Sequence, residues 1–250
     1  MRFAAVIVLV SAMLVAVTTA VAQVKLQGHA SIHGSTTITY PINAQSAYFT
    51  TSGQGILFPA NSDFSFGTND FTIEAWAYHT ANNSTYRQLM GIWGATNLWQ
   101  LTWCSGTSMS LVWQSSGSCN PTGFNPSLNT WYHYAWTRQG STNRFFVNGT
   151  LQFSTTDSTN YTNVGSYIGI GVAYNQSFTF AGYVTGVRVL NGQAAYTSNF
   201  TPSHATTFAH NSNCVLLTDF STTSDQSPKA RGAYTNQGSV TFSSFVPTNW

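Results

Sequence analysis

Short runs of β-branched and aromatic residues, separated by clusters of Gly, Pro, Asn and Ser, extend over most of this chain. Such runs are typical of strands, and a helical period of apolar positions is nearly absent after the first 22 residues. In the run Phe71–Tyr78, bulky apolar side chains fall on both faces of the expected strand, which indicates a central strand. The run Trp131–Trp136 alternates similarly and predicts a second strand with a filled inner face. The pattern predicts an all-β sandwich.

The dipeptide Asn148-Gly149 predicts a two-residue β-hairpin. It stands between the strand-like runs Arg144–Val147 and Thr150–Phe153. Asn and Gly both accept the positive φ values that such a turn requires. Two adjacent antiparallel strands are therefore expected here.

Three segments occur in a fixed order, and their motifs are specific only as a set. They are Gly67–Trp76 (Gly-Thr-Asn-Asp-Phe-Thr-Ile-Glu-Ala-Trp), Trp131–Gly149 and Gly182–Pro202. Together they resemble the laminin-G-like domains of the concanavalin A-like lectin and glucanase superfamily, such as those of phage virion and bacterial surface proteins. The resemblance implies an antiparallel jelly-roll β-sandwich. Family members usually carry an acidic residue where this chain has Thr185, so a metal site that depends on this acid is not carried over.

The first 22 residues are expected to be a hydrophobic leader. Arg2 supplies the positive start, Ala4–Val17 is a short apolar run, and Ala20-Val21-Ala22 is a signal-peptidase pattern that predicts cleavage before Gln23. The alternative is a retained anchor, because the apolar stretch nearly reaches the length of a bilayer span. Both predict a domain outside the cytoplasm, and only the second predicts contact with a membrane.

Three parts are expected after the leader. Residues 23–44 form an approach segment, 45–205 form the laminin-G-like domain, and 206–250 form a β-rich tail. The tail either completes its own sandwich or adds strands to a neighbouring subunit.

Charge is scarce in this chain. Charged residues make up 6% of it, and the formal net charge of +2 falls to +1 without Arg2. A protein that binds a nucleic-acid backbone needs a basic field, so no nucleic-acid partner is expected.

Cysteine usage agrees with export. Cys104 and Cys119 flank a stretch that looks like a returning strand, so a disulfide between them is plausible, with Cys214 left over. Three buried thiols are the alternative. No Cys-x-x-Cys or paired Cys/His spacing indicates zinc.

The scarcity of acids argues against catalysis. Glycoside hydrolases need two carboxylates at a defined separation, and the Glu-x-Asp-x-x-Glu stretch of the related glucanases is missing. Glu74 is the only glutamate and is expected to pair with Arg138 or Arg188. A serine hydrolase is no better supported, because Gly-x-Ser-x-Gly is absent and the six histidines lie apart from any recognisable acid partner. We therefore expect no catalytic residues.

Cofactors are not expected, with calcium as a weak exception. Asp63 and Asp70 stand in one loop region with Asn61 and Asn69. They are candidate ligands for Ca²⁺, but turn-forming roles for these Asx side chains are the alternative.

Aromatic side chains are the remaining candidates for ligand binding. Aromatic rings stack on the apolar faces of sugars, and amides bind their hydroxyls. Segments expected to lie near one another or in loops contain the candidates Trp93, Trp99, Trp103, Trp113, Tyr174 and Asn97. The alternative is that these tryptophans fill the core.

Two functions are therefore open. The first is a secreted or surface-exposed, non-catalytic carbohydrate-binding or adhesion module whose partner is a glycan surface. The second is a structural subunit of a virion, fibre or extracellular filament that self-associates. N-glycosylation motifs are present at Asn82, Asn83, Asn148, Asn160, Asn175 and Asn199.

Overall fold

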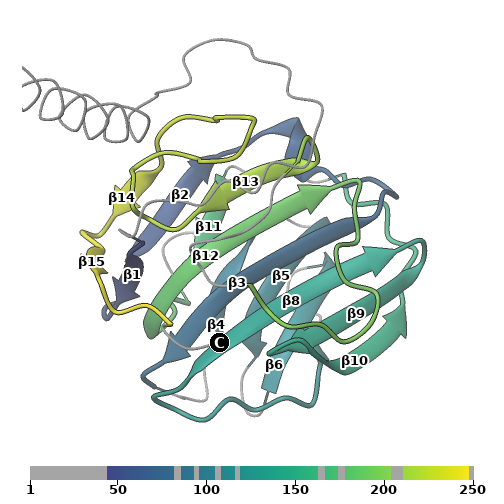
Figure 1. Cartoon of the computed structure of the whole chain (residues 1–250), viewed down its shortest axis with the longest axis horizontal. Coiled ribbons are helices and arrows are strands. Elements are labelled where there is room, and N and C mark those ends of the chain that lie inside the picture. Colours follow the sequence, from purple (N-terminus) through teal and green to yellow (C-terminus); the bar gives the residue numbers. More distant parts are fainter. Residues whose placement is uncertain are drawn as a thin grey trace, which may run out of the picture. The chain divides into compact units, whose positions relative to one another are not determined.

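The computed structural model describes residues 44–81, 86–92, 96–104, 108–115, 119–162, 167–173, 178–203 and 211–247, with the backbone alone at 108 and 112–115. The expected leader and most of the approach segment lie outside these ranges. Two antiparallel sheets face each other and form a sandwich (Figure 1). Within the described ranges, no helix has the length and apolar character needed to cross a bilayer.

Sheet A contains eight strands. In spatial order they are β10 (Thr150–Thr156), β9 (Thr142–Val147), β8 (Trp131–Gln139), β3 (Phe71–His79), β12 (Gly182–Asn191), β1 (Ser46–Phe49) and β15 (Thr241–Ser243), with β13 (Cys214–Thr218) also paired to β12.

Sheet B contains seven strands. In spatial order they are β14 (Thr235–Gln237), β2 (Gly55–Pro59), β11 (Tyr167–Ile170), β4 (Arg87–Ile92), β5 (Thr96–Cys104), β6 (Ser108–Ser115) and β7 (Cys119–Pro121). A single 3-10 turn, η1 (Ser62–Phe64), follows β2 among the described residues. The all-β sandwich expected from the sequence is confirmed.

Strand β3 is central, as its two apolar faces predicted. It pairs with β8 on one side and β12 on the other. Its inner face packs in the core between the sheets, where Phe71 lies 4.7 Å from Phe66 and 5.3 Å from Trp136, measured between ring centroids. Trp99 enters the same cluster from sheet B, with its ring 5.4 Å from Phe66. Aromatic packing therefore joins the two sheets.

The predicted hairpin at Asn148-Gly149 is confirmed. The two residues have φ values of 48° and 75° and connect β9 to β10. A side chain at Gly149 is excluded twice, by its positive φ and by the carbonyl oxygen of Phe200, which would lie 1.8 Å from an added Cβ. Asn148 is also fixed, because its Oδ1 accepts a hydrogen bond of 2.8 Å from the backbone N–H of His133.

The last strands of the tail pair within this chain. Strand β13 adds to β12, β14 adds to β2, and β15 adds to β1. The yellow end of the chain therefore lies beside the blue beginning of the described part (Figure 1). Because β14 borders sheet B and β15 borders sheet A, the tail covers one edge of each sheet.

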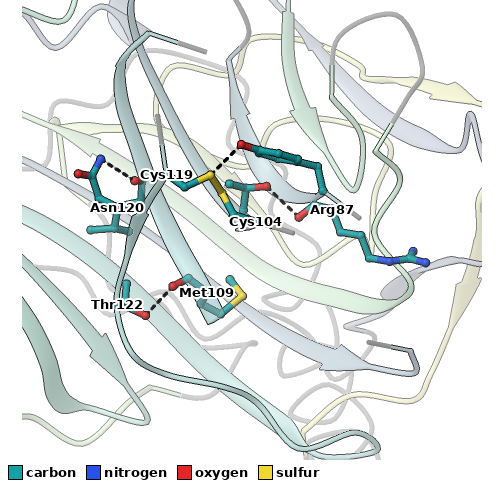
Figure 2. Close-up of a disulfide and its surroundings, with 9 residues drawn as sticks. Arg87, Cys104, Met109, Cys119, Asn120 and Thr122 are labelled. Carbon is teal, nitrogen blue, oxygen red and sulfur yellow. Dashed lines mark hydrogen bonds between the residues drawn. A yellow bond between two sulfur atoms is a disulfide. The ribbon is translucent and has the colours of Figure 1, made fainter. Parts of the chain in front are cut away.

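The predicted disulfide is present. Cys104 ends β5 and Cys119 begins β7, with a Cα–Cα distance of 6.3 Å (Figure 2). The segment after Cys119 is held against β6 by Thr122, whose hydroxyl donates to the carbonyl of Met109 at 2.7 Å. Cys214 stays a buried thiol, and burial raises its pKa to about 12.

We expect the disulfide to stabilise the fold by closing a loop with a sequence separation of 15. Replacing both Cys104 and Cys119 by Ser should lower the free energy of unfolding by about 3 kcal/mol, mainly because the unfolded chain regains conformational entropy. Urea unfolding with and without dithiothreitol measures this change. The reductant should lower the free energy of unfolding of the native protein and leave that of the variant unchanged. Thiol labelling of the denatured, unreduced chain should find one thiol, and none in Cys214→Ser. Three labelled thiols would contradict the bond.

A neutral histidine is buried in the core. His79 is 2% exposed, and its Nε2 lies 2.9 Å from the hydroxyl of Tyr134. Burial, with a smaller effect of the Arg87 charge, lowers the pKa of His79 to about 3. In the unfolded chain the same group protonates near its ordinary pKa of 6.5. The unfolded state therefore binds more protons than the folded state between these two pH values.

Acidification through this window should destabilise the protein. The free energy of unfolding should fall by as much as about 1.4 kcal/mol per pH unit as the pH drops from about 6 to about 4.5. The variant His79→Gln should be less stable at neutral pH, but its free energy of unfolding should depend less steeply on pH. The two proteins share all other histidines, so the difference in slope reports His79. Urea titrations of both proteins across this range measure the slopes. Parallel slopes would mean that His79 is protonated in the folded state.

Candidate functional site

Three loops form a cleft at one rim of the sandwich. It has a volume of about 340 Å³ and is lined by Thr50–Ser52, Tyr86, Arg87 and Phe178–Phe180. The first segment follows β1, the second leads into β4, and the third precedes β12. We call this feature the rim cleft.

The rim cleft combines aromatic rings with hydroxyl groups. The ring of Phe178 is 39% exposed and lies 5.5 Å from that of Tyr86, between centroids. Hydroxyls come from Thr50, Thr51, Ser52 and Thr179. Aromatic rings that border hydroxyls are suited to a ligand with apolar faces and polar edges.

The backbone of Phe178 adopts the left-handed conformation, with φ of 58°. This conformation is unfavourable for a bulky side chain, so the surrounding structure must hold it. The carbonyl of Phe178 accepts from the N–H of Gln88 at 2.9 Å, and the next residue, Thr179, accepts from the N–H of Gly53 at 3.0 Å. A strained residue that is fixed on both sides presents its ring in one defined position.

Arg87 supplies the charge of the rim cleft. Its Nη1 donates to the carbonyl of Thr179 at 2.9 Å, which also ties β4 to the loop before β12. Burial lowers the pKa of Arg87 from its ordinary value, but the guanidinium still carries its charge at neutral pH. No carboxylate is among the lining residues, so the local charge is positive.

The disulfide contacts one of the residues that line the rim cleft. The hydroxyl of Tyr86 lies 2.9 Å from the sulfur of Cys119. In Figure 2 the side chain of Arg87 extends away from the disulfide. The covalent link between β5 and β7 therefore also helps to fix an aromatic ring of the cleft.

A comparison with protein families decides the classification. The family model described as the concanavalin A-like lectin/glucanases superfamily, in a laminin G form, matches residues 50–209. This range is well over half of the chain. The chain belongs to the concanavalin A-like lectin/glucanase superfamily. The resemblance stated from the three ordered segments is confirmed.

Of the solved structures similar to this chain, the first described here shows the same fold. A candidate carbohydrate binding protein from Bacteroides ovatus is 15% identical with a TM-score of 0.59, and the match covers 82% of this chain and 60% of that one. Domain 4 of AbnA, a GH43 extracellular arabinanase from Geobacillus stearothermophilus solved with arabinotriose, is 18% identical with a TM-score of 0.49, over 58% and 71% of the two chains. At 15% identity the likeness to the Bacteroides ovatus protein concerns the fold alone. Among curated proteins, no sequence matches this chain.

The tryptophans expected to bind a ligand are not gathered at the rim cleft. In this superfamily member Trp99 is fully buried, and its Nε1 donates to the carbonyl of Phe64 at 3.2 Å. Trp103 is 6% exposed and packs 5.7 Å from the ring of His79. Both therefore fill the core between the sheets, which corrects the expectation that they face a ligand. Trp99 and Trp103 are separated by an even number of positions on β5, so both side chains lie on the same face, and this is the face turned toward the core.

The other candidates have mixed outcomes. Asn97 is half-buried with φ of 53°, and its amide donates to the hydroxyl of Thr162 at 3.3 Å. Trp93 and Tyr174 lie outside the described residues, as does the side chain of Trp113. Ligand binding by Trp93, Tyr174, Trp113 and Asn97 stays a prediction.

Tyr86 and Phe178 were not predicted from the sequence. Both directly follow polar loop-like stretches, Asn82–Thr85 and Asn175–Ser177. An aromatic residue at the end of such a stretch is the signal that could have indicated them. The positive φ of Phe178 has no such signal.

The two calcium candidates have other contacts. Asp63 pairs with Arg231 and lies 3.9 Å from the ammonium of Lys229, whereas Asp70 accepts from the N–H of Gly140 at 2.7 Å. Asn61 accepts from the N–H of Asp63, the turn-forming role expected for Asx residues here. Among the described residues, no group of three or more His, Cys, Asp or Glu side chains could hold a metal. Calcium at Asp63 stays a prediction, and it would require the displacement of Arg231.

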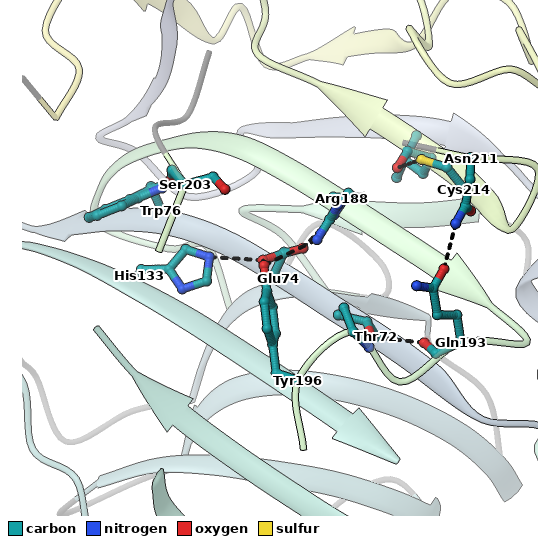
Figure 3. Close-up of polar contacts among 12 residues, drawn as sticks. Thr72, Glu74, Trp76, His133, Arg188, Gln193, Tyr196, Ser203, Asn211 and Cys214 are labelled. Atoms are coloured by element: carbon teal, nitrogen blue, oxygen red, sulfur yellow. Dashed lines mark hydrogen bonds and ion pairs between the residues drawn. The ribbon is translucent and has the colours of Figure 1, made fainter. Parts of the chain in front are cut away.

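The only glutamate lies in a buried polar network on the outer face of sheet A. Glu74 is fully buried, with Oε1 2.5 Å from Nε of Arg188 and Oε2 3.0 Å from Nε2 of His133 (Figure 3). The hydroxyl of Tyr196 donates to Oε2 at 2.9 Å. The expected pairing with an arginine is confirmed for Arg188. The expectation that no histidine has an acid partner is wrong for His133, because 59 residues separate the pair in the sequence.

Electrostatics explain why Glu74 keeps its charge. Burial alone would raise its pKa, but Arg188 and His133 outweigh this effect, so the pKa of Glu74 is lowered. The segment after β12 covers the network, with Thr72 donating to the carbonyl of Gln193 at 2.9 Å and Trp76 donating to the carbonyl of Ser203 at 3.1 Å. Glu74 and His133 have no access to solvent, and the contacts of Glu74 are those of a structural ion pair.

At the superfamily's usual acidic position, Thr185 takes a different role. It is fully buried, and its hydroxyl donates to the carbonyl of Gln45 at 2.7 Å. A bulge follows between Thr185 and Arg188, where Gly186 has φ of 55°. The bulge allows the guanidinium to reach Glu74 across the strand pair.

Removing the carboxylate of Glu74 should leave the buried guanidinium of Arg188 without a counter-charge. Glu74→Ala should lower the free energy of unfolding by about 3–5 kcal/mol, because Arg188 loses its counter-charge while it stays buried. Asp63→Ala is the control, since Asp63 is half-exposed and its ion pair with Arg231 should contribute at most about 1 kcal/mol. Urea unfolding at neutral pH measures both. Equal losses in the two variants would contradict a special role for the buried network.

Proposed function

We propose that this protein is a non-catalytic carbohydrate-binding module that acts outside the cytoplasm and binds its glycan in the rim cleft. The observation that carries the proposal is the ring of Phe178, which is 39% exposed and held in a strained backbone conformation beside four hydroxyl-bearing side chains. A sugar ring presents an apolar face to such a ring and its hydroxyls to the edges of the cleft.

The remaining lining groups suit the same ligand. Tyr86 adds a second ring at 5.5 Å from Phe178, and Arg87 offers guanidinium donors to sugar hydroxyls or to an acidic substituent. Preformed geometry supports binding, because Arg87 and Phe178 are already tied to neighbouring backbone.

The distribution of acids supports a non-catalytic role. Glycoside hydrolysis needs two carboxylates that flank the scissile bond. The rim cleft is lined by none, and Glu74 is fully buried in an ion pair. Asp157 is likewise buried beside Arg138, at 3.7 Å.

Location outside the cytoplasm is supported by two features. The leader-like first 22 residues predict export. The Cys104–Cys119 bond is of the kind that persists in oxidising compartments. The Bacteroides ovatus protein of the same fold, described as carbohydrate binding, agrees with the proposed activity.

Affinity gel electrophoresis tests the proposal. The native protein should be retarded by at least one soluble polysaccharide among xylan, arabinan, laminarin, hydroxyethyl cellulose and polygalacturonate. Phe178→Ala should weaken that interaction about tenfold, since the stacking ring is lost. If only the gel with polygalacturonate retards the native protein, and Arg87→Gln abolishes this retardation, the ligand is acidic.

Leu151→Ala is the matched control. Leu151 is 41% exposed on β10, far in the strand order from the loops of the cleft, so its loss should leave retention unchanged. Equal retention of the native protein and Phe178→Ala would contradict binding at the rim cleft. Absence of retardation by all five polymers would contradict the proposed function.

A further inference from the structure

Four aromatic side chains form a row across the outer face of sheet A. Tyr48 of β1 pairs in register with Tyr183 of β12, Tyr183 with Tyr78 of β3, and Tyr78 with Trp131 of β8. Residues that are partners in register on adjacent antiparallel strands point to the same face. With strands about 4.8 Å apart, three spacings give the row a length of about 14 Å. We call these four residues the aromatic row.

The rings of the aromatic row are in mutual contact. Tyr48 and Tyr183 stack with centroids 4.1 Å apart and planes 9° apart. Tyr78 lies 5.8 Å from Tyr183 and 5.6 Å from Trp131. The three tyrosines are half-buried, so part of each ring faces outward. All four side chains are uncharged at neutral pH, which makes the surface apolar with hydroxyl edges.

A residue of the tail covers the aromatic row. The ring of Phe245 lies 4.9 Å from Tyr78, 5.0 Å from Tyr183 and 5.4 Å from Trp131, yet it is 42% exposed. The yellow segment after β15 reaches the lower end of β12 in Figure 1.

The attachment of this cover is slight. Strand β15 has three residues, and beyond it the carbonyl of Phe245 accepts one bond of 2.7 Å from the hydroxyl of Ser46. The N–H of Phe245 donates locally, to the hydroxyl of Ser243 two positions earlier, at 3.1 Å. Short terminal segments with few bonds are the first parts of a fold to open.

One polar group of the aromatic row is unsatisfied. Trp131 is 8% exposed, and its Nε1 is buried without a hydrogen-bond partner among the residues that the structure describes. A buried N–H without an acceptor is unfavourable, and the ring of Phe245 provides no oxygen to accept from it. The aromatic row therefore has an unused donor on a residue that Phe245 contacts.

We propose that the aromatic row is a second carbohydrate-binding site, for a neutral polysaccharide chain that lies across the strands and displaces Phe245. The sugar rings stack on the tyrosines as the phenyl ring does now, and a sugar oxygen accepts from Nε1 of Trp131. This inference goes beyond the proposed function, because it concerns a separate surface of sheet A and does not depend on the rim cleft.

The unused donor favours a glycan over a second copy of the chain. An apolar protein surface docked on the aromatic row would leave Nε1 of Trp131 without an acceptor, as it is now. A sugar chain offers both apolar faces and oxygen acceptors along its length. The absence of charge in the four side chains favours a neutral chain over an acidic one.

The test removes the cover and follows binding to neutral polymers. In gels that contain xylan, arabinan, laminarin or hydroxyethyl cellulose, Phe245→Ala should be retained about tenfold more strongly than the native protein by at least one polymer, because the competing ring is gone. Leu128→Ala is the matched control, since Leu128 is 40% exposed outside the row and should change nothing. Adding Tyr183→Ala to Phe245→Ala should abolish the gain.

Two further measurements separate this site from the rim cleft. The gain of Phe245→Ala should persist in the Phe178→Ala background, even if the rim cleft binds nothing. In protein labelled with ¹⁵N-tryptophan, the indole signal of Trp131, assigned with Trp131→Phe, should shift when the retained polymer's oligosaccharide is added. Melting curves check that each variant is folded.

No gain with any of the four polymers in a folded Phe245→Ala variant would overturn the proposal. So would an unshifted Trp131 signal. A gain in self-association, seen by light scattering in place of polysaccharide binding, would assign the aromatic row to a second copy and would overturn it as well.

Discussion

The ion pair of Glu74 with Arg188 is the constraint on which the outer face of sheet A depends. A charged carboxylate in the middle of the central strand can only be buried if a cation and further donors reach it, and the bulge in β12, the imidazole of His133 and the hydroxyl of Tyr196 meet this need. Tyr196 comes from the segment that crosses the face, so the network fixes that segment as well. That segment does not extend over the aromatic row, whose cover is the ring of Phe245.

Because charged residues are scarce, the surface of the protein is polar through uncharged groups. Because acids are few and several are paired internally, the outward groups of this module are mainly hydroxyls, amides and rings. Only four large hydrophobic side chains of the described residues are classed as exposed, and two of them are the phenylalanines of the rim cleft and the tail.

Local patterns were sufficient for the fold and insufficient for the site. The alternation in Phe71–Tyr78 and the Asn148-Gly149 turn depend on neighbouring residues, so both could be read from the sequence. Trp99 and Trp103 alternate just as a binding strand would, and only the packing of sheet A against their face shows that they are core. The cleft and the aromatic row assemble residues from distant strands, with registers and backbone angles that no local pattern encodes.

The tail covers one edge of each sheet, and this has a consequence for how the protein folds during synthesis. The hydroxyl of Ser46 bonds to a carbonyl 199 positions later, and β15 and β14 pair with the first two strands of the fold. Such a topology has high contact order, which slows folding and delays it until β14 and β15 have been synthesised. For the export proposed above, this delay is favourable, because a nascent chain that stays open until these two strands are synthesised can be threaded through a translocation pore.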